Sequence, residues 1–304
     1  MASPAPPFFH DQKTSFTSYP CVALNRSRPI IVAAASIATL AGGMAFAARH
    51  LNPYRPQLVR LSVPLPAAHA HLAGLRIAFV TDTHLGPSIT ERNLIRATAL
   101  LTAERPDLVL LGGDYISESP RHARPAAAIL GRLAVSAPLG GFAVLGNHDL
   151  ANDAGKVTAA LEAEGIMVLR NRATPVSTAS GVLWIAGIDE AILSRPDLEE
   201  TFASIPQGSA VLALWHEPDG AARAAALGAF LQLSGHSHGG QVRLPGLGAL
   251  AAPPGGRHFV AGLNHAGGMP VYTSRGVGVY RPPVRLNCPP EVTLVTLTRR
   301  TNRS

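Results

Sequence analysis

The stretch LRIAFVTDTH, residues 75–84, joins an apolar run of strand length to an aspartate and a histidine. A run with no polar alternation predicts a strand buried on both faces, which is typical of a sheet covered by helices. Asp82 and His84 follow the run directly, so we expect them at the carboxyl end of that strand. Ligands of α/β sheets bind outside the carboxyl ends of the strands. The stretch therefore predicts an α/β fold and one part of a binding site.

Four later segments repeat this pattern of an apolar run followed by polar residues. The runs LVLL, FAVL, VLALW and FLQL precede GGD, GNHD, HEPD and GHSHGG, in that order. Segments with helical spacing of apolar residues, such as 92–103 and 126–133, alternate with them and favour an α/β layered fold. The five polar ends are expected to meet at one edge of the sheet, and they carry Asp82, His84, Asp114, Asn147, His148, His216, His236 and His238.

Carboxylate, imidazole and amide groups occur together in this set, and borderline divalent metals accept all three as ligands. Each motif alone is weak evidence, because a single histidine at a strand end is more often a half-buried residue than a ligand. Five motifs in order, each after an apolar run, make that interpretation improbable for the set. Glycines flank the motifs, and glycine lets the backbone turn sharply and approach an ion closely. The sequence thus predicts a metal site suited to Mn, Fe or Zn.

The order D-x-H, GD, GNHD, single His and GHxH resembles the calcineurin-like metallophosphoesterases over roughly residues 72–297. The segments GGDYIS, HEPDG, GHSHGGQVRLP and RPPVRLNCPPEVTLVTL narrow the resemblance to a bacterial membrane-associated phosphodiesterase branch (YaeI/YkuE-like). The resemblance implies a four-layer α/β/β/α sandwich, here preceded by one N-terminal apolar helix.

The resemblance also assigns a role to each polar residue. It gives Asp82, His84 and His238 to one metal, Asn147, His216 and His236 to a second, and Asp114 to both. It places His148 facing the substrate, where it would act with Asp114 in catalysis by stabilising the transition state or protonating the leaving group. Asp149 has two open interpretations, a carboxylate that orients a histidine or an N-terminal helix cap.

The function implied is a phosphodiesterase or pyrophosphatase that uses two divalent ions and a bridging hydroxide. Its substrate would be lipid-linked or a nucleotide diphosphate. Arg275 and Arg281, in the late Gly- and Pro-rich region, are candidates to meet a second phosphate. Two other functions stay open: a nuclease or nucleotide phosphodiesterase, and a non-enzymatic metal-binding scaffold.

Composition divides the chain of 304 residues into four parts. We expect a disordered basic leader over residues 1–28 and an apolar segment over 29–48. A Pro-rich linker over 49–72 then leads into a metallophosphoesterase domain over 73–300. Residues 29–48 contain no charged residue and predict a transmembrane anchor, or a cleaved signal ending near Ala45-Phe46-Ala47.

The net charge of +7 lies mostly in the first 60 residues, which hold six Lys and Arg residues and one acid, Asp11. A basic tail beside an apolar segment favours a membrane partner, and a nearly balanced domain argues against nucleic acid. We therefore expect a location at the bacterial inner membrane, with the domain outside the cytoplasm. The oligomeric state stays open.

Overall fold

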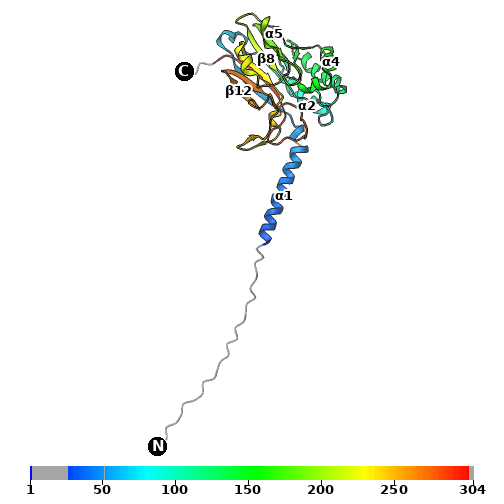
Figure 1. The fold of residues 1–304 in the computed structure, drawn as a ribbon, viewed down its shortest axis with the longest axis vertical. Helices are drawn as coiled ribbons and strands as arrows, with labels where there is room; N and C mark the ends of the chain where they lie inside the picture. Colours follow the sequence, from blue (N-terminus) through cyan, green and yellow to red (C-terminus); the bar gives the residue numbers. More distant parts are fainter. Residues whose placement is uncertain (2–26, 51, 301–304) are drawn as a thin grey trace. The chain divides into compact units, whose positions relative to one another are not determined.

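A computed structural model describes Met1 and residues 27–50 and 52–300 of the chain (Figure 1). The chain divides into two compact units, residues 1–43 and 44–304. Apart from Met1 and residues 27–28, the leader expected over 1–28 lies outside the described residues. The second unit contains two six-stranded sheets and all five polar motifs.

The first sheet carries three of the five polar motifs. Its strands run in the order β1 (Gln57–Pro64), β14 (Glu291–Thr298), β2 (Arg76–Val80), β3 (Leu108–Leu111), β4 (Gly141–Ala143) and β5 (Ile166–Val168). Neighbours are parallel except β14 and β2, which pair antiparallel. Because β2, β3 and β4 are parallel neighbours, the motifs that follow them leave the sheet at the same edge.

The second sheet carries the other two motifs. Its order is β12 (Gly262–Ala266), β13 (Met269–Thr273), β9 (Ala229–Ser234), β8 (Ala210–Trp215), β7 (Gly181–Ile188) and β6 (Arg172–Thr178). The four central strands are parallel, and the two outermost pairs are antiparallel. A small hairpin of β10 (Arg243–Leu244) and β11 (Gly248–Ala249) lies between β9 and β12 in sequence.

Three apolar cores hold these elements together. One joins the first sheet to the long helices α2 (Glu91–Thr102), α3 (Ala123–Val135) and α4 (Asn147–Ala163). A second contains residues of both sheets, including Phe79 and Leu214. The third joins the second sheet to the short helices α5 (Leu198–Ala203) and α6 (Ala221–Ala226). Short 3-10 turns are η1 (Asn52–Tyr54), η2 (Ala67–Leu72), η3 (Pro120–His122) and η4 (His238–Gly240). The α/β fold is confirmed, and the four-layer order stays a prediction that the three cores support.

The linker expected over residues 49–72 contains a strand of the first sheet. Residues 57–64 form β1, which pairs along its whole length with β14, and Val63 and Leu65 are buried in the core between the sheets. Residues 59–63, VRLSV, alternate apolar and polar residues as a strand with one buried face does. The prolines on either side of the strand are typical of a connection and mask this short period.

Residues 29–48, the expected anchor or signal, lie within the helix α1 (Ser27–His50). None of the helices in the described part of the chain combines the length and the apolar character that a membrane crossing requires. The transmembrane prediction is therefore not confirmed. In the second unit, Ala48 is buried and its carbonyl accepts a hydrogen bond of 2.8 Å from the backbone N–H of Arg285.

Candidate metal centre

The predicted ligands occupy turns with an unusual backbone. Asp82, His84, Asp114, His236 and His238 all have φ between 46° and 67°. This left-handed region is uncommon for residues other than glycine and costs about 1–3 kcal/mol at each position. Such conformations persist where the surrounding structure imposes them, and they cluster at functional sites.

Two glycines give these turns the space they need. A Cβ atom on Gly146 would lie 2.2 Å from Oδ1 of Asp114, and one on Gly235 would lie 2.1 Å from Oδ2 of Asp82. Any side chain at either position would displace a carboxylate. The glycine of GNHD therefore lets that segment approach the Asp114 carboxylate, and the glycine of GHSH lets a segment of the second sheet approach the Asp82 carboxylate.

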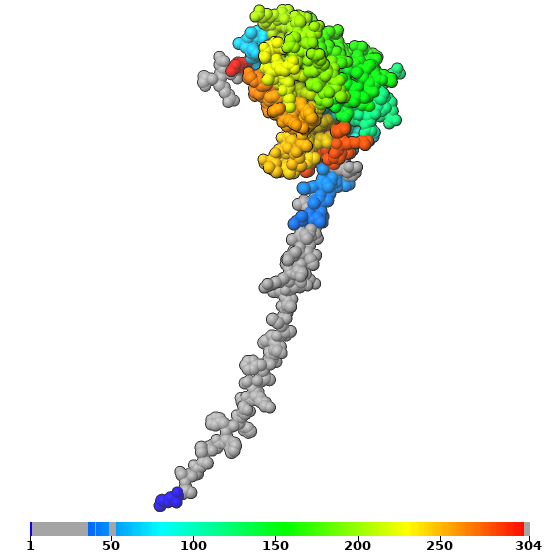
Figure 2. All heavy atoms as spheres, in the orientation of Figure 1, coloured from blue at the N-terminus to red at the C-terminus, as the bar shows by residue number. Residues whose placement is uncertain are grey.

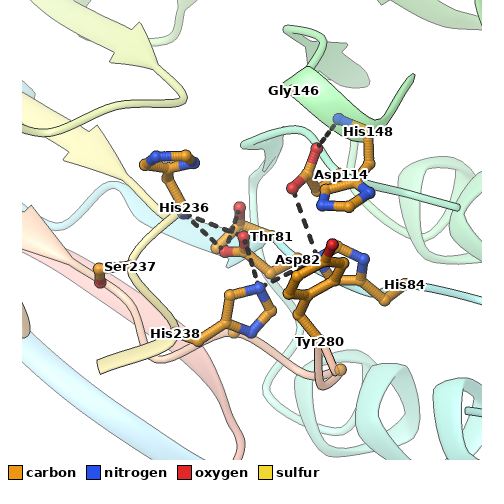
Figure 3. A network of polar contacts seen from close by, with 12 residues as sticks. Thr81, Asp82, His84, Asp114, Gly146, His148, His236, Ser237, His238 and Tyr280 are labelled. Carbon is orange, nitrogen blue, oxygen red and sulfur yellow. Dashed lines mark hydrogen bonds and ion pairs between the residues drawn. The ribbon is translucent and has the colours of Figure 1, made fainter. Parts of the chain in front are cut away.

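The first group of possible ligands contains side chains that follow strands of both sheets. Ligand atoms of Asp82, His84, Asp114 and His238 all lie within 4.8 Å of one another, and all four residues are buried. Nε2 of His84 is 3.4 Å from Oδ2 of Asp114, and Nε2 of His238 is 3.5 Å from Oδ1 of Asp82 (Figure 3). The backbone N–H of His236 donates to both Asp82 oxygens, at 3.0 and 3.1 Å, which fixes that carboxylate. This group could hold one metal ion.

The second group shares Asp114 with the first and adds His216 and His236. The Nδ1–H of His216 donates to the Gly112 carbonyl at 2.7 Å, which leaves Nε2 free, 3.3 Å from Oδ2 of Asp114. In His236 the roles are reversed, because Nε2–H donates to the Pro254 carbonyl at 2.8 Å and leaves Nδ1 as the available atom. Carbonyl contacts of this kind fix the tautomer of metal-binding histidines. His216 is thus well placed to act as a metal ligand.

Two buried atoms test whether the centre fits a metal. Oδ1 of Asn147 and Nε2 of His216 are buried and have no hydrogen-bond partner among the described residues. A buried polar atom without a partner is costly, so it calls for an explanation such as an ion. Both atoms are of the kind that divalent metals bind. The donor set therefore fits a metal centre.

The protonation states of the centre are mixed. Burial raises the pKa of Asp82, and, against the effect of burial, the Asp114 carboxylate raises the pKa of His216 well above its ordinary value. Three other groups are shifted towards the forms that bind metals. Burial alone would raise the pKa of Asp114, but the neighbouring His216 and His84 hold it well below its usual range. Burial, together with His216, lowers the pKa of His236 to about 4, so this imidazole is neutral near pH 7. Burial and then His84 likewise lower the pKa of His238 well below its ordinary value. An ionised carboxylate and neutral imidazoles are the protonation states that bind metals.

His148 lies beside the centre and lines the adjoining cavity. Its backbone N–H donates to Oδ1 of Asp114 at 2.8 Å, and its Nδ1 is 3.3 Å from the Ser117 carbonyl. Its ring centroid lies 4.8 Å from those of both His84 and Tyr280 (Figure 3). Burial lowers its pKa. The ring is therefore close to the centre without belonging to either ligand group.

Asp149 orients backbone groups, and no histidine contacts it among the described residues. Its carboxylate accepts the N–H groups of Asp114 at 2.7 Å, Tyr115 at 2.9 Å and Gly146 at 3.0 Å. The N-cap of α4 is Gly146, so Asp149 is not the cap residue itself but the third residue of the helix, which accepts the N–H of the cap. Burial, and then Asp114, raise the pKa of Asp149 to about 7, against the effect of the three donors. Asp149 thus ties the GD turn to the start of α4.

Sequence patterns missed Tyr280 and Gln241, which also line the cavity. Gln241 lies three residues after His238 and accepts the backbone N–H of Tyr280 at 2.7 Å, which holds the two segments together. Of the two arginine candidates, Arg275 pairs with Glu291, while Arg281 lines the cavity and pairs with Glu118 at 2.7 Å.

Comparison with known proteins identifies the class. The family model of the calcineurin-like phosphoesterases matches residues 75–240, which contain the five polar motifs that follow strands. The chain therefore belongs to the calcineurin-like phosphoesterase family, whose members are metal-dependent phosphoester hydrolases.

Particular relatives narrow the position within the family. The chain is 32% identical over 266 residues to the uncharacterized metallophosphoesterase YkuE of Bacillus subtilis, covering 87% of this chain and 93% of that protein. It is 34% identical over 283 residues to the phosphodiesterase YaeI of Escherichia coli, covering 90% and 99%. A transmembrane protein with a metallophosphoesterase domain from Danio rerio is 28% identical and covers 80% of this chain and 57% of that protein. The resemblance to the YaeI/YkuE-like branch is thereby confirmed.

Proposed function

We propose that this chain is a phosphodiesterase or pyrophosphatase with a dinuclear metal centre. One observation carries the proposal: the Asp114 carboxylate belongs to both groups of ligand atoms. A carboxylate between two ion sites is what a two-metal clamp on a phosphate requires. The family membership supports the same reaction class.

In this proposal each ion has three ligands of its own. Asp82, His84 and His238 would hold the first, Asn147, His216 and His236 the second, and Asp114 both. Mn, Fe or Zn suit this set of oxygen and nitrogen ligands. When bound, the ions would supply an activated water and neutralise charge on the phosphoryl oxygens.

The chain itself supplies the proton and the orientation. His148 Nδ1 is held by the Ser117 carbonyl, which leaves Nε2 as the atom that exchanges a proton with the substrate. Burial lowers the pKa of this ring, and a bound phosphate anion would act in the opposite direction. Nε2 would then carry a proton to the leaving oxygen. The hydrogen bond from the His148 backbone N–H to Asp114 fixes the position of this residue beside the centre.

The substrate and location are proposed from the sequence. A lipid-linked or nucleotide-diphosphate substrate and a site at the bacterial inner membrane, with the domain outside the cytoplasm, would give the apolar N-terminal segment a use. The relative from Danio rerio is named as a transmembrane protein, which supports a membrane location.

The test uses the full chain, stripped with a chelator and reloaded with Mn, Fe or Zn in separate samples. We expect hydrolysis of bis-p-nitrophenyl phosphate to return with at least one metal and to be absent in the stripped protein. Turnover that is equal with and without chelator would refute the proposal.

A further inference from the structure

The cavity beside the centre is much larger than a phosphate group. Its volume is about 760 Å³, which lies within the range of sites that hold drug-sized ligands. Five residues of its lining belong to the centre or lie beside it: Asp114, Asn147, His148, His236 and His238. Most of the others are apolar, and we call their part of the cavity the apolar arm: Ile192, Val242, Leu250, Pro253, Pro254 and Val284.

The apolar arm is continuous with the centre. The Pro254 carbonyl accepts the N–H of the predicted ligand His236 at 2.8 Å, so the arm begins where the second ligand group ends. Leu250 and Val242 are neighbours, because the N–H of Leu250 donates to the Val242 carbonyl at 3.1 Å. A substrate whose phosphate lies at the centre would therefore extend into the arm.

Two polar side chains along this path are already hydrogen-bonded within the protein. Gln241 accepts the N–H of Tyr280 and donates to the carbonyl of the same residue at 3.1 Å. The Ser237 hydroxyl donates to the Val260 carbonyl at 2.5 Å. A sugar or base placed against these two side chains would lose its water without regaining equivalent hydrogen bonds, which is unfavourable.

Apolar side chains also remain exposed where the cavity opens. Ile192 is 46% exposed, Leu250 59% and Tyr280 51%, although all three line the cavity. They come from three separate segments of the chain, so no single apolar run explains them. Figure 2 shows the segment around residue 250, in gold, protruding from the body of the second unit. Apolar groups gathered at a cavity mouth mark a ligand site.

We propose that the apolar arm binds a hydrocarbon chain, so that the substrate is a phosphoester of an aliphatic alcohol or lipid. The inference rests on the proposed function, because it assumes that the phosphate lies at the metal centre. Of the two substrates left open above, it selects the lipid-linked one over the nucleotide diphosphate.

The test measures how the rate depends on chain length. The full-length, metal-loaded protein is given p-nitrophenyl phosphodiesters with methyl, butyl and octyl groups, all below their micelle concentrations. Burial of each methylene should raise kcat/KM by roughly two- to fourfold until the arm is filled. A p-nitrophenyl ester of thymidine 5′-phosphate should be hydrolysed more slowly than the octyl ester.

Two leucines of the hairpin region provide the variant and its control. Leu250→Asp should flatten the chain-length dependence, because the charge lies in the arm. Leu247→Asp changes a residue that is 77% exposed and does not line the cavity, so it should keep the wild-type dependence. Binding of methyl and octyl phosphate to the stripped protein, measured by calorimetry, should show the same preference without turnover.

The outcomes separate the two proposals. Hydrolysis of the methyl ester with no gain for the octyl ester would overturn the apolar arm and leave the proposed function standing. A faster thymidine ester would overturn the arm in favour of a nucleotide substrate. Failure of every ester with every metal would refute the proposed function itself.

Discussion

The Nε2 atoms of His84 and His238 lie 3.0 Å apart in the buried centre of the molecule. The carboxylates of Asp114 and Asp82 lie 3.4 and 3.5 Å from these two nitrogens, one beside each ring. Four atoms with lone pairs therefore face one small space, which adjoins the cavity that Asp114 and His238 line. A divalent cation is the partner that satisfies all of them together.

Removing metal should therefore destabilise the fold. An ion at a hundred times its Kd contributes about 2.7 kcal/mol, which corresponds to a loss of roughly 5–10 °C in Tm for a domain of this size. Thermal unfolding with and without chelator measures the change, and added metal should reverse it. An unchanged Tm after verified loss of metal would contradict this expectation.

His148→Ala should slow hydrolysis without releasing metal. The ring lines the cavity but belongs to neither ligand group, so its loss removes a proton donor and leaves the ligands intact. General acid catalysis contributes about 10²- to 10⁴-fold, and kcat should fall within that range. His265→Ala, at an exposed position of β12, is the matched control and should keep wild-type kcat. A variant that loses metal along with activity would assign His148 to the ligands instead.

Asp219 should stabilise the chain in a way that depends on pH. Its carboxylate accepts the backbone N–H groups of Arg257 at 2.8 Å, His258 at 3.0 Å and Phe259 at 3.2 Å. Burial opposes ionisation, but these donors hold the pKa of Asp219 below its usual value. A lowered pKa in the folded state gives stability above the unfolded value, near 3.9, that is lost as pH falls through the folded value.

The comparison of wild type with Asp219→Ala measures this contribution by urea unfolding. We expect the variant to be less stable by about 1–3 kcal/mol at pH 7. The difference should shrink as pH falls below about 4. A difference that stays constant down to the acid transition would show that the carboxylate acts only by packing.

Removing β1 should damage the first sheet. All eight residues of β1 pair with β14, so a chain that begins at residue 66 would expose the edge of β14. We expect that chain to aggregate or unfold at a lower temperature than one beginning at residue 44. Equal unfolding temperatures for the two chains would mean that β1 contributes little to stability.

The sequence predicted the parts of the molecule that depend on local pattern. The five strands before the polar motifs are present, and Asp82, Asp114 and His216 lie where the strand-end argument placed them. The helix α4 begins at Asn147, because the GNHD motif itself forms its first turn, and the non-helical Asp153 separates this turn from the rest of the helix.

The sequence could not predict what depends on the packing of distant segments. The cavity draws on loops near residues 192, 250 and 280, which share no period or motif. Tyr280 meets His148 on a segment that is held by Gln241 and by the pair of Arg281 with Glu118. Periodicity describes one element at a time, so contacts between irregular loops leave no such signal.

The most direct test of the central claim counts metal ions and activity in the same samples. Wild type, Asp114→Asn and the control Asp153→Asn are stripped, titrated with Mn, and assayed for bound metal and for hydrolysis of bis-p-nitrophenyl phosphate. Asp114 belongs to both ligand groups, whereas Asp153 pairs with Lys156 away from them. We predict two ions per chain and full activity for wild type and the control, with weakened binding of both ions and activity reduced at least a hundredfold in Asp114→Asn. Full activity in that variant, or in wild type with no bound metal, would contradict the account.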